Sequence, residues 1–104
     1  MQIQFNTDNN VTGSKDFIAS STSLISEELR RFSDQISRVE VHLSDEDGNK
    51  DGLNDKRCML EARLEGRQPI AVTNHANTHE QAISGAIDKL LASLETIQGR
   101  MKNH

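Results

Sequence analysis

The residues with the clearest potential for metal chemistry lie in the acidic stretch 45–55. Asp47-Gly48-Asn49-Lys50-Asp51-Gly52 fits the first six positions of a calcium loop, in which alternate Asp and Asn oxygens face one ion. The twelfth position should supply a bidentate Glu, but it is Cys58, and the flanking residues alternate as strands do. The sequence therefore favours a solvated loop between two strands over a calcium site.

Two histidines, His75 and His79, have the H-x3-H spacing that brings two metal ligands together inside one helix. Thr78 and Gln81 form a capping box, which places the start of a helix between the two histidines. No cysteine or acidic cluster accompanies them. We therefore expect neither a metal site nor a cofactor.

Several polar residues are expected to share one face of a sheet and could imitate a hydrolytic site: Glu40, His42, Glu61, Arg63 and Thr73. Cross-strand pairing of Glu with Arg produces the same pattern without any catalytic role. The sequence also has no Gly-rich phosphate loop after a strand and no nucleophile elbow. These observations predict a binding protein that is not an enzyme and has no small-molecule substrate.

The basic residues have a spacing that suits phosphate binding. Arg30 and Arg31 stand near the end of one predicted helix. Lys89 and Arg100 lie three helical turns apart in another, with Lys102 at its end. If the helices pack side by side, these cations form a positive strip that would contact phosphates without reading bases. The alternative interpretation is an ordinary helix surface with solvated charges.

The composition limits the fold and the partners. A chain of 104 residues has room for one domain, 1–104, and its 34% hydrophobic and 3% aromatic content predicts an aliphatic core. The net charge of −4 resides in residues 45–55, which hold five acids and one Lys, so the remainder is neutral. Broad attraction to nucleic acid is therefore disfavoured, but a local basic patch is not.

The chain lacks an apolar stretch of the roughly 20 residues that a membrane span requires. It also lacks a basic segment followed by an apolar one at the N-terminus, the pattern of a signal peptide. The single Cys58 cannot form an internal disulfide. The sequence predicts a cytoplasmic protein with no membrane partner.

Hydrophobic periodicity predicts the elements that would position these residues. Alternation indicates strands at 2–6, 38–43, 56–65 and 69–72, and helical spacing indicates helices from Ser14 to about Asp34 and from Thr78 almost to the end. The first helical stripe comprises Phe17, Ser21, Leu24, Ile25, Leu29, Phe32 and Ile36. The order β-α-β-β-β-α predicts an α+β fold, a four-stranded mixed sheet with both helices on one face. Six residues should lie beneath the helices: Ile3, Phe5, Val41, Leu60, Leu64 and Val72.

Three segments resemble one protein family. They are Leu29-Arg30-Arg31-Phe32, the strand Val39 to Ser44, and the last helix with Ala82-Ile83, Ile87, Lys89-Leu90 and Leu94. Together with the element order, they make the chain similar to a short form of the ribosome hibernation-promoting factors and ribosome-associated inhibitors.

The resemblance implies a bacterial stress-response protein that binds the 30S ribosomal subunit. Its target would be 16S rRNA in the channel used by mRNA and tRNA, so that translation is blocked during stress or stationary phase. The residues implied to bind RNA are Arg30, Arg31, Lys89, Arg100 and Lys102. The alternative is a protein-interaction adaptor on the same fold, which would use the open sheet face or the acidic loop 45–55.

Overall fold

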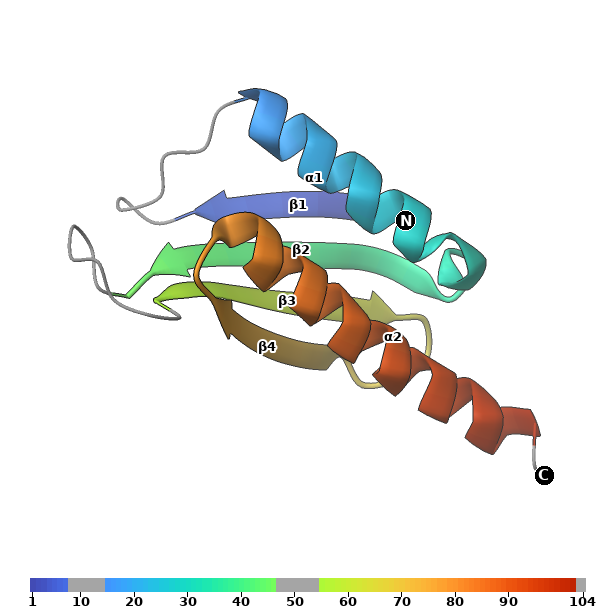
Figure 1. Cartoon of the computed structure of the whole chain (residues 1–104). Helices are drawn as coiled ribbons and strands as arrows, with labels where there is room; N and C mark the ends of the chain where they lie inside the picture. Colours follow the sequence, from blue (N-terminus) through green and yellow to red (C-terminus); the bar gives the residue numbers. More distant parts are fainter. Residues whose placement is uncertain (8–14, 47–54, 103–104) are drawn as a thin grey trace.

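The computed structural model describes residues 1–7, 15–46 and 55–102, with the backbone alone for residues 100–102. Within these residues the elements follow the predicted order (Figure 1). They are β1 (Gln2–Thr7), α1 (Lys15–Glu28), a 3₁₀ turn η1 (Arg30–Phe32), β2 (Ile36–Asp45), β3 (Lys56–Leu64), β4 (Ile70–Ala76) and α2 (His79–Lys102).

The four strands form one mixed sheet in the order β1-β2-β3-β4. β1 and β2 are parallel, because α1 carries the chain back across the sheet, whereas β3 pairs antiparallel with both of its neighbours. Both helices lie on the same face of this sheet, and α2 extends beyond its end (Figure 1). The predicted α+β architecture is confirmed.

The alternation in the strands assigns each residue to the predicted face. Val41 and Leu60 are opposite one another and fully buried beneath the helices, while Arg63 is exposed. Ile3, Phe5 and Val72 are partly buried against the same core. Because a one-residue slip would have reversed these faces, the predicted register is confirmed.

The end of the first helix differs from the prediction. α1 ends at Glu28, and a tighter turn follows in which the Phe32 N–H donates to the Leu29 carbonyl at 2.9 Å. Ile36 is therefore not a helical residue but the buried first residue of β2. Ile36 continues the helical spacing of Leu29 and Phe32 in the sequence because the turn and the following strand bury all three side chains in the same core. Leu24, placed on the buried stripe by spacing, is 42% exposed.

The start of α2 is fixed by a local cap. The Gln81 backbone N–H donates to Thr78 Oγ1 at 3.1 Å, one of the two hydrogen bonds expected of a capping box. Beyond this cap α2 presents a regular apolar stripe to the sheet: Ala82, Ile83, Ala86, Ile87, Leu90 and Leu94 are all buried. The predicted helix boundary at Thr78 is confirmed.

Gly85 allows α2 to approach β4 closely. A Cβ at this position would lie 2.1 Å from Asn74 Nδ2, and this amide donates to the Gln81 and Ala82 carbonyls at 3.4 and 3.3 Å. We expect Gly85→Ala to cost about 1 kcal/mol, because the loss of the Asn74 hydrogen bonds outweighs the gain in helix propensity. In an Asn74→Ala background the same change should stabilise by about 0.5–1 kcal/mol. Urea unfolding of the four proteins in this double-mutant cycle measures the coupling, and strictly additive effects would contradict it.

Two of the five acids assigned to the acidic loop are not loop residues. Asp45 ends β2 and Asp55 precedes β3, and both are buried. Lys56 Nζ lies 2.9 Å from Asp45 Oδ2 and 3.1 Å from Asp55 Oδ1. The prediction that the whole acidity of 45–55 is solvated is therefore wrong, because β2 extends further than expected, to Asp45, and Asp55 is buried just before β3. The calcium-like motif Asp47 to Gly52 lies outside the described residues.

Candidate functional site

The helix layer consists of α1, η1 and α2. Arg30 and Arg31 lie in η1, the turn that leads from α1 to β2. Arg30 forms an exposed ion pair with Glu27, 3.0 Å between Nη2 and Oε1. The Arg31 guanidinium pairs with Glu95 of α2 and lies 4.7 Å from the centre of the Phe32 ring. The turn therefore presents two arginines to solvent, each with an acidic partner from the helix layer.

Lys89 lies on the opposite flank of α2 from Arg31. Its ammonium donates to the Thr73 carbonyl at 2.8 Å, and Thr73 belongs to the edge strand β4. The backbone of Arg100 and Lys102 lies in the last part of α2, but their side chains lie outside the described residues. Arg31 and Lys89, whose side chains are both described, therefore lie on two sides of α2 and do not form one continuous positive strip.

The acidic partners of these cations were not identified from the sequence. Glu27 stands three residues before Arg30, a spacing at which side chains meet on a helix, so this pair had a local signal. Glu95 is 64 residues from Arg31, and only the packing of η1 against α2 brings the two together. The segments α1, η1 and α2 hold six basic and six acidic side chains, so the helix layer has no net charge.

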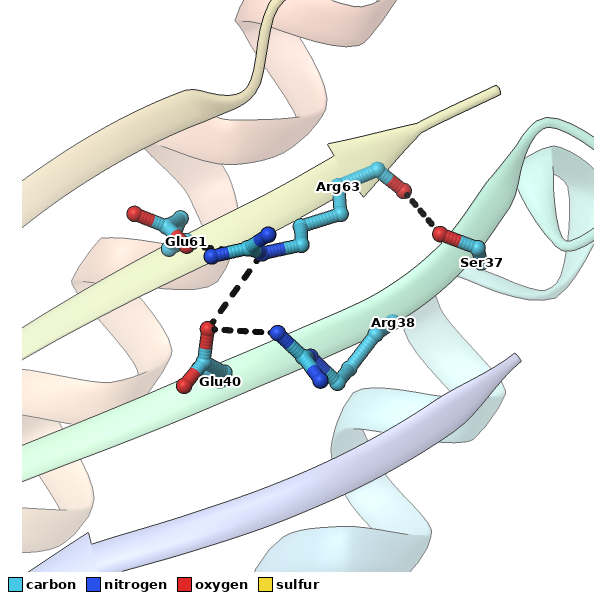
Figure 2. Close-up of polar contacts among 5 residues, drawn as sticks. All are labelled: Ser37, Arg38, Glu40, Glu61 and Arg63. Carbon is cyan, nitrogen blue, oxygen red and sulfur yellow. Dashed lines mark hydrogen bonds and ion pairs between the residues drawn. The ribbon is translucent and has the colours of Figure 1, made fainter.

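The opposite face of the sheet carries a network of charges (Figure 2). The Glu40 carboxylate lies 3.4 Å from Arg38 Nη2 and 3.5 Å from Arg63 Nε, and the same Nε is 3.3 Å from Glu61. The Ser37 hydroxyl donates to the Arg63 carbonyl at 3.1 Å, beside the irregularity in pairing between Ile36 and Arg38. Because two Glu and two Arg neutralise one another, this network accounts for the pattern that resembled a hydrolytic site.

The pKa of Glu40 is lowered within this network. Desolvation raises the pKa, but hydrogen bonding with Glu61 and the charges of Arg38 and Arg63 together outweigh it. A lowered pKa stabilises the fold above the unfolded value of 4.5, and this stabilisation is lost as pH falls through the folded value. Glu40→Gln should therefore lower the melting temperature at pH 7 and leave it closer to wild type near pH 3. Thermal unfolding between pH 7 and 3 checks this, and a constant difference between the two proteins would contradict it.

The remaining groups with chemical potential are structural in the described part of the chain. Burial raises the pKa of the Cys58 thiol to about 12, so this side chain is an unreactive core residue. The His75 ring is 3.0 Å from Glu46, while the His79 ring packs edge-on against Phe17 at 6.4 Å, so the two histidines do not converge. No three His, Cys, Asp or Glu side chains within the described ranges gather as metal ligands would. Neither described helix has a stretch apolar and long enough to cross a membrane.

Comparisons with known proteins extend over almost the whole chain. The family model of the Sigma 54 modulation protein / S30EA ribosomal protein family matches residues 7–102. The crystal structure of the Thermus thermophilus Protein Y N-terminal domain has a TM-score of 0.72 at 17% identity, covering 93% of this chain and 99% of that one. A ribosomal subunit interface protein from Coxiella burnetii has a TM-score of 0.69 at 19% identity, covering 95% and 99%. At these identities the two structures show the fold alone, and no curated protein sequence matches significantly.

The match to the family model covers far more than half of the chain and includes both helices and the last three strands. It confirms the resemblance found in the end of the first helix, the second strand and the last helix. The chain belongs to the Sigma 54 modulation protein / S30EA ribosomal protein family.

Proposed function

We propose that this protein binds the small ribosomal subunit in the cytoplasm and inhibits translation by occupying 16S rRNA in the mRNA/tRNA channel. The observation that carries the proposal is the family match over residues 7–102. It is supported by the shared fold with a protein described as a ribosomal subunit interface protein, which is covered over nearly its full length. The mechanism is occlusion, which requires affinity and shape but no catalytic group.

The helix layer supplies the cations for such a contact. Arg30, Arg31 and Lys89 are exposed, and each can reach a phosphate oxygen while fixing the protein on the RNA backbone. Arg100 and Lys102 would extend this surface along the overhanging end of α2. Arginine suits the contact because its planar fork can donate two hydrogen bonds to one phosphate.

The acidic partners determine the strength of this contact. The ion pairs Arg30–Glu27 and Arg31–Glu95 are more than half exposed on both sides. Exposed ion pairs contribute only about 0–1 kcal/mol, so phosphate can replace the carboxylate at little cost. With no net charge on the helix layer, affinity must come from these close contacts and not from long-range attraction.

Co-sedimentation tests the proposal. The protein should pellet with 30S and 70S particles at low salt and be released as salt rises, because each neutralised phosphate releases counterions. Bound protein should also reduce translation in a reconstituted system and compete with mRNA and initiator tRNA. Failure to pellet with either particle at low salt would refute the proposal.

The Arg31–Glu95 contact gives a variant that should bind more tightly. Glu95→Gln removes the internal competitor of the phosphate while it keeps the length of the side chain. We expect affinity for 30S subunits to rise about two- to fivefold, the equivalent of one exposed ion pair. Glu80→Gln, at the start of α2, removes the same charge away from Arg31 and serves as the control. Sedimentation at several salt concentrations measures both, and equal effects of the two variants would assign the gain to net charge.

The adaptor alternative has less support in the described residues. The open sheet face neutralises its own charges in the Arg38–Glu40–Arg63–Glu61 network (Figure 2). Two carboxylates of the stretch 45–55 are buried against Lys56 and cannot meet a basic partner. We therefore favour the helix layer as the binding surface.

A further inference from the structure

A small pocket opens on the sheet face opposite the helices, near the carboxyl ends of the parallel strands β1 and β2. Its volume is about 250 Å³. The lining residues come from three strands: Asn6 and Thr7 of β1, His42, Leu43 and Ser44 of β2, and Arg57 of β3. It is separate from the helix surface proposed to bind the ribosome.

The strand register explains why these side chains meet. Asn6 is the partner of His42 across the parallel pair, and Ser44 is the partner of Arg57 across the antiparallel pair. His42 and Ser44 are two residues apart on β2, so both point to the same face. The polar side chains of Asn6, His42, Ser44 and Arg57 therefore surround one opening.

Every polar side chain that lines the pocket can donate a hydrogen bond. Asn6 and Arg57 donate through amide and guanidinium N–H groups, Ser44 through its hydroxyl and His42 through its ring. Thr7 is the partner of the buried Leu43, so its side chain lies on the helix side of the sheet and is not one of these donors. None of the described lining residues carries a carboxylate. The Asn6 Nδ2 atom is buried and has no hydrogen-bond partner among the described residues, so a ligand that accepts from it would satisfy this donor.

Arg57 retains capacity to bind an anion. Its Nε is 3.8 Å from Glu46 Oε1, and that same oxygen is closer to His75, at 3.0 Å. The other guanidinium nitrogens of Arg57 make no ion pair with the described residues. Glu40, two residues before His42 on the same face of β2, is held by Arg38 and Arg63. The electrostatics at the pocket therefore favour a negative ligand.

We propose that this pocket binds a phosphate group, with Arg57 supplying the charge and Asn6, His42 and Ser44 donating hydrogen bonds. The volume is below the roughly 300–1,000 Å³ of sites for drug-sized ligands, which suits a small oxyanion. The inference does not depend on ribosome binding, because it uses the other face of the sheet.

Nitrogen-15 NMR titration with sodium phosphate, against sodium chloride at equal ionic strength and pH 7, tests the proposal. We expect saturable shifts of the Asn6 side-chain amide and of Arg57 Nε with phosphate alone. Arg57→Gln should weaken binding about tenfold or more, because it removes a charge-assisted hydrogen bond. Arg67→Gln, in the exposed turn between β3 and β4, should leave the affinity unchanged.

Shifts that rise linearly with either salt, or equal affinity in wild type and Arg57→Gln, would overturn the proposal. Asn6→Ala provides a second test that leaves the charge intact, and it should also reduce affinity while the backbone spectrum stays native. A nucleoside 5′-monophosphate and a dinucleoside phosphodiester then distinguish a terminal from an internal RNA phosphate. Binding of inorganic phosphate without either nucleotide would assign the pocket to the free ion.

Discussion

Replacing Arg30, Arg31, Lys89 and Arg100 together by glutamine should abolish co-sedimentation with 30S subunits. Residual binding should also depend less on salt. If each cation neutralises one phosphate, the slope of the logarithm of affinity against the logarithm of salt concentration should become shallower by about one unit per lost contact. The fold should persist, because surface substitutions usually change stability by within about 0.5 kcal/mol. Sedimentation across a salt series, together with thermal unfolding of each protein, checks both expectations.

A control variant removes cations from elsewhere on the molecule. Arg63 and Arg67, changed together to glutamine, lower the net charge without altering the helix layer or Arg57. This protein should still pellet with 30S subunits. If the helix variant binds as well as wild type while the control does not, the RNA contact lies on the sheet face and the assignment to the helices is wrong.

Lys56→Met should cause the largest loss of stability among single changes to a charged residue. Lys56 is the shared partner of two carboxylates whose side chains are only 8% and 3% exposed, those of Asp45 and Asp55. Removing the ammonium leaves two adjacent negative charges in a site with little water, a situation far costlier than breaking a surface pair. We expect the melting temperature to fall on the order of 10 °C.

A matched variant separates charge from packing. Lys56→Met combined with Asp45→Asn and Asp55→Asn removes all three charges and should recover much of the lost stability. A triple variant no more stable than Lys56→Met would show that the aliphatic stem of Lys56 matters, and not its charge.

Alkaline unfolding gives an independent check on Lys56. Hydrogen bonds to Asp45 and Asp55 raise the pKa of the ammonium above its ordinary 10.5. A raised pKa gives stability that is complete below the unfolded value and is lost as pH rises through the folded value. The wild type should therefore lose more stability than the triple variant above about pH 10.5. Parallel unfolding curves of the two proteins across this range would argue against the raised pKa.

The sequence predicted the sheet well because each strand is half-buried. Apolar residues alternate with polar ones in Val39–Leu43 and Cys58–Leu64, and only one register buries all the apolar ones. This period of two was therefore enough to predict which face of the sheet each residue occupies. Boundaries were harder to predict. η1 continues the apolar spacing of α1 through Leu29 and Phe32, which made Ile36 look helical.

The site was predictable only where its signals are local. The basic residues and the cap at Thr78 could be identified from short patterns. The contacts of Arg31 with Glu95 and of Lys89 with Thr73 join distant segments, so their partners depend on packing that no local pattern encodes. The same holds for Asp45, Asp55 and Lys56, which meet because β2 and β3 pair to their ends across a long connection.

The bond from Lys89 to the Thr73 carbonyl would also oppose the addition of another strand to the sheet. β4 is an edge strand, and free backbone carbonyls on an edge invite pairing with another chain. A lysine that covers such a carbonyl places a charge where a second strand would dock. If the Lys89 ammonium binds RNA phosphate instead, the Thr73 carbonyl on the edge of β4 becomes free only in the bound state. There the ribosome would itself keep a second copy of the protein away from that edge. The residue proposed to contact RNA would then also oppose edge-to-edge association of the unbound protein.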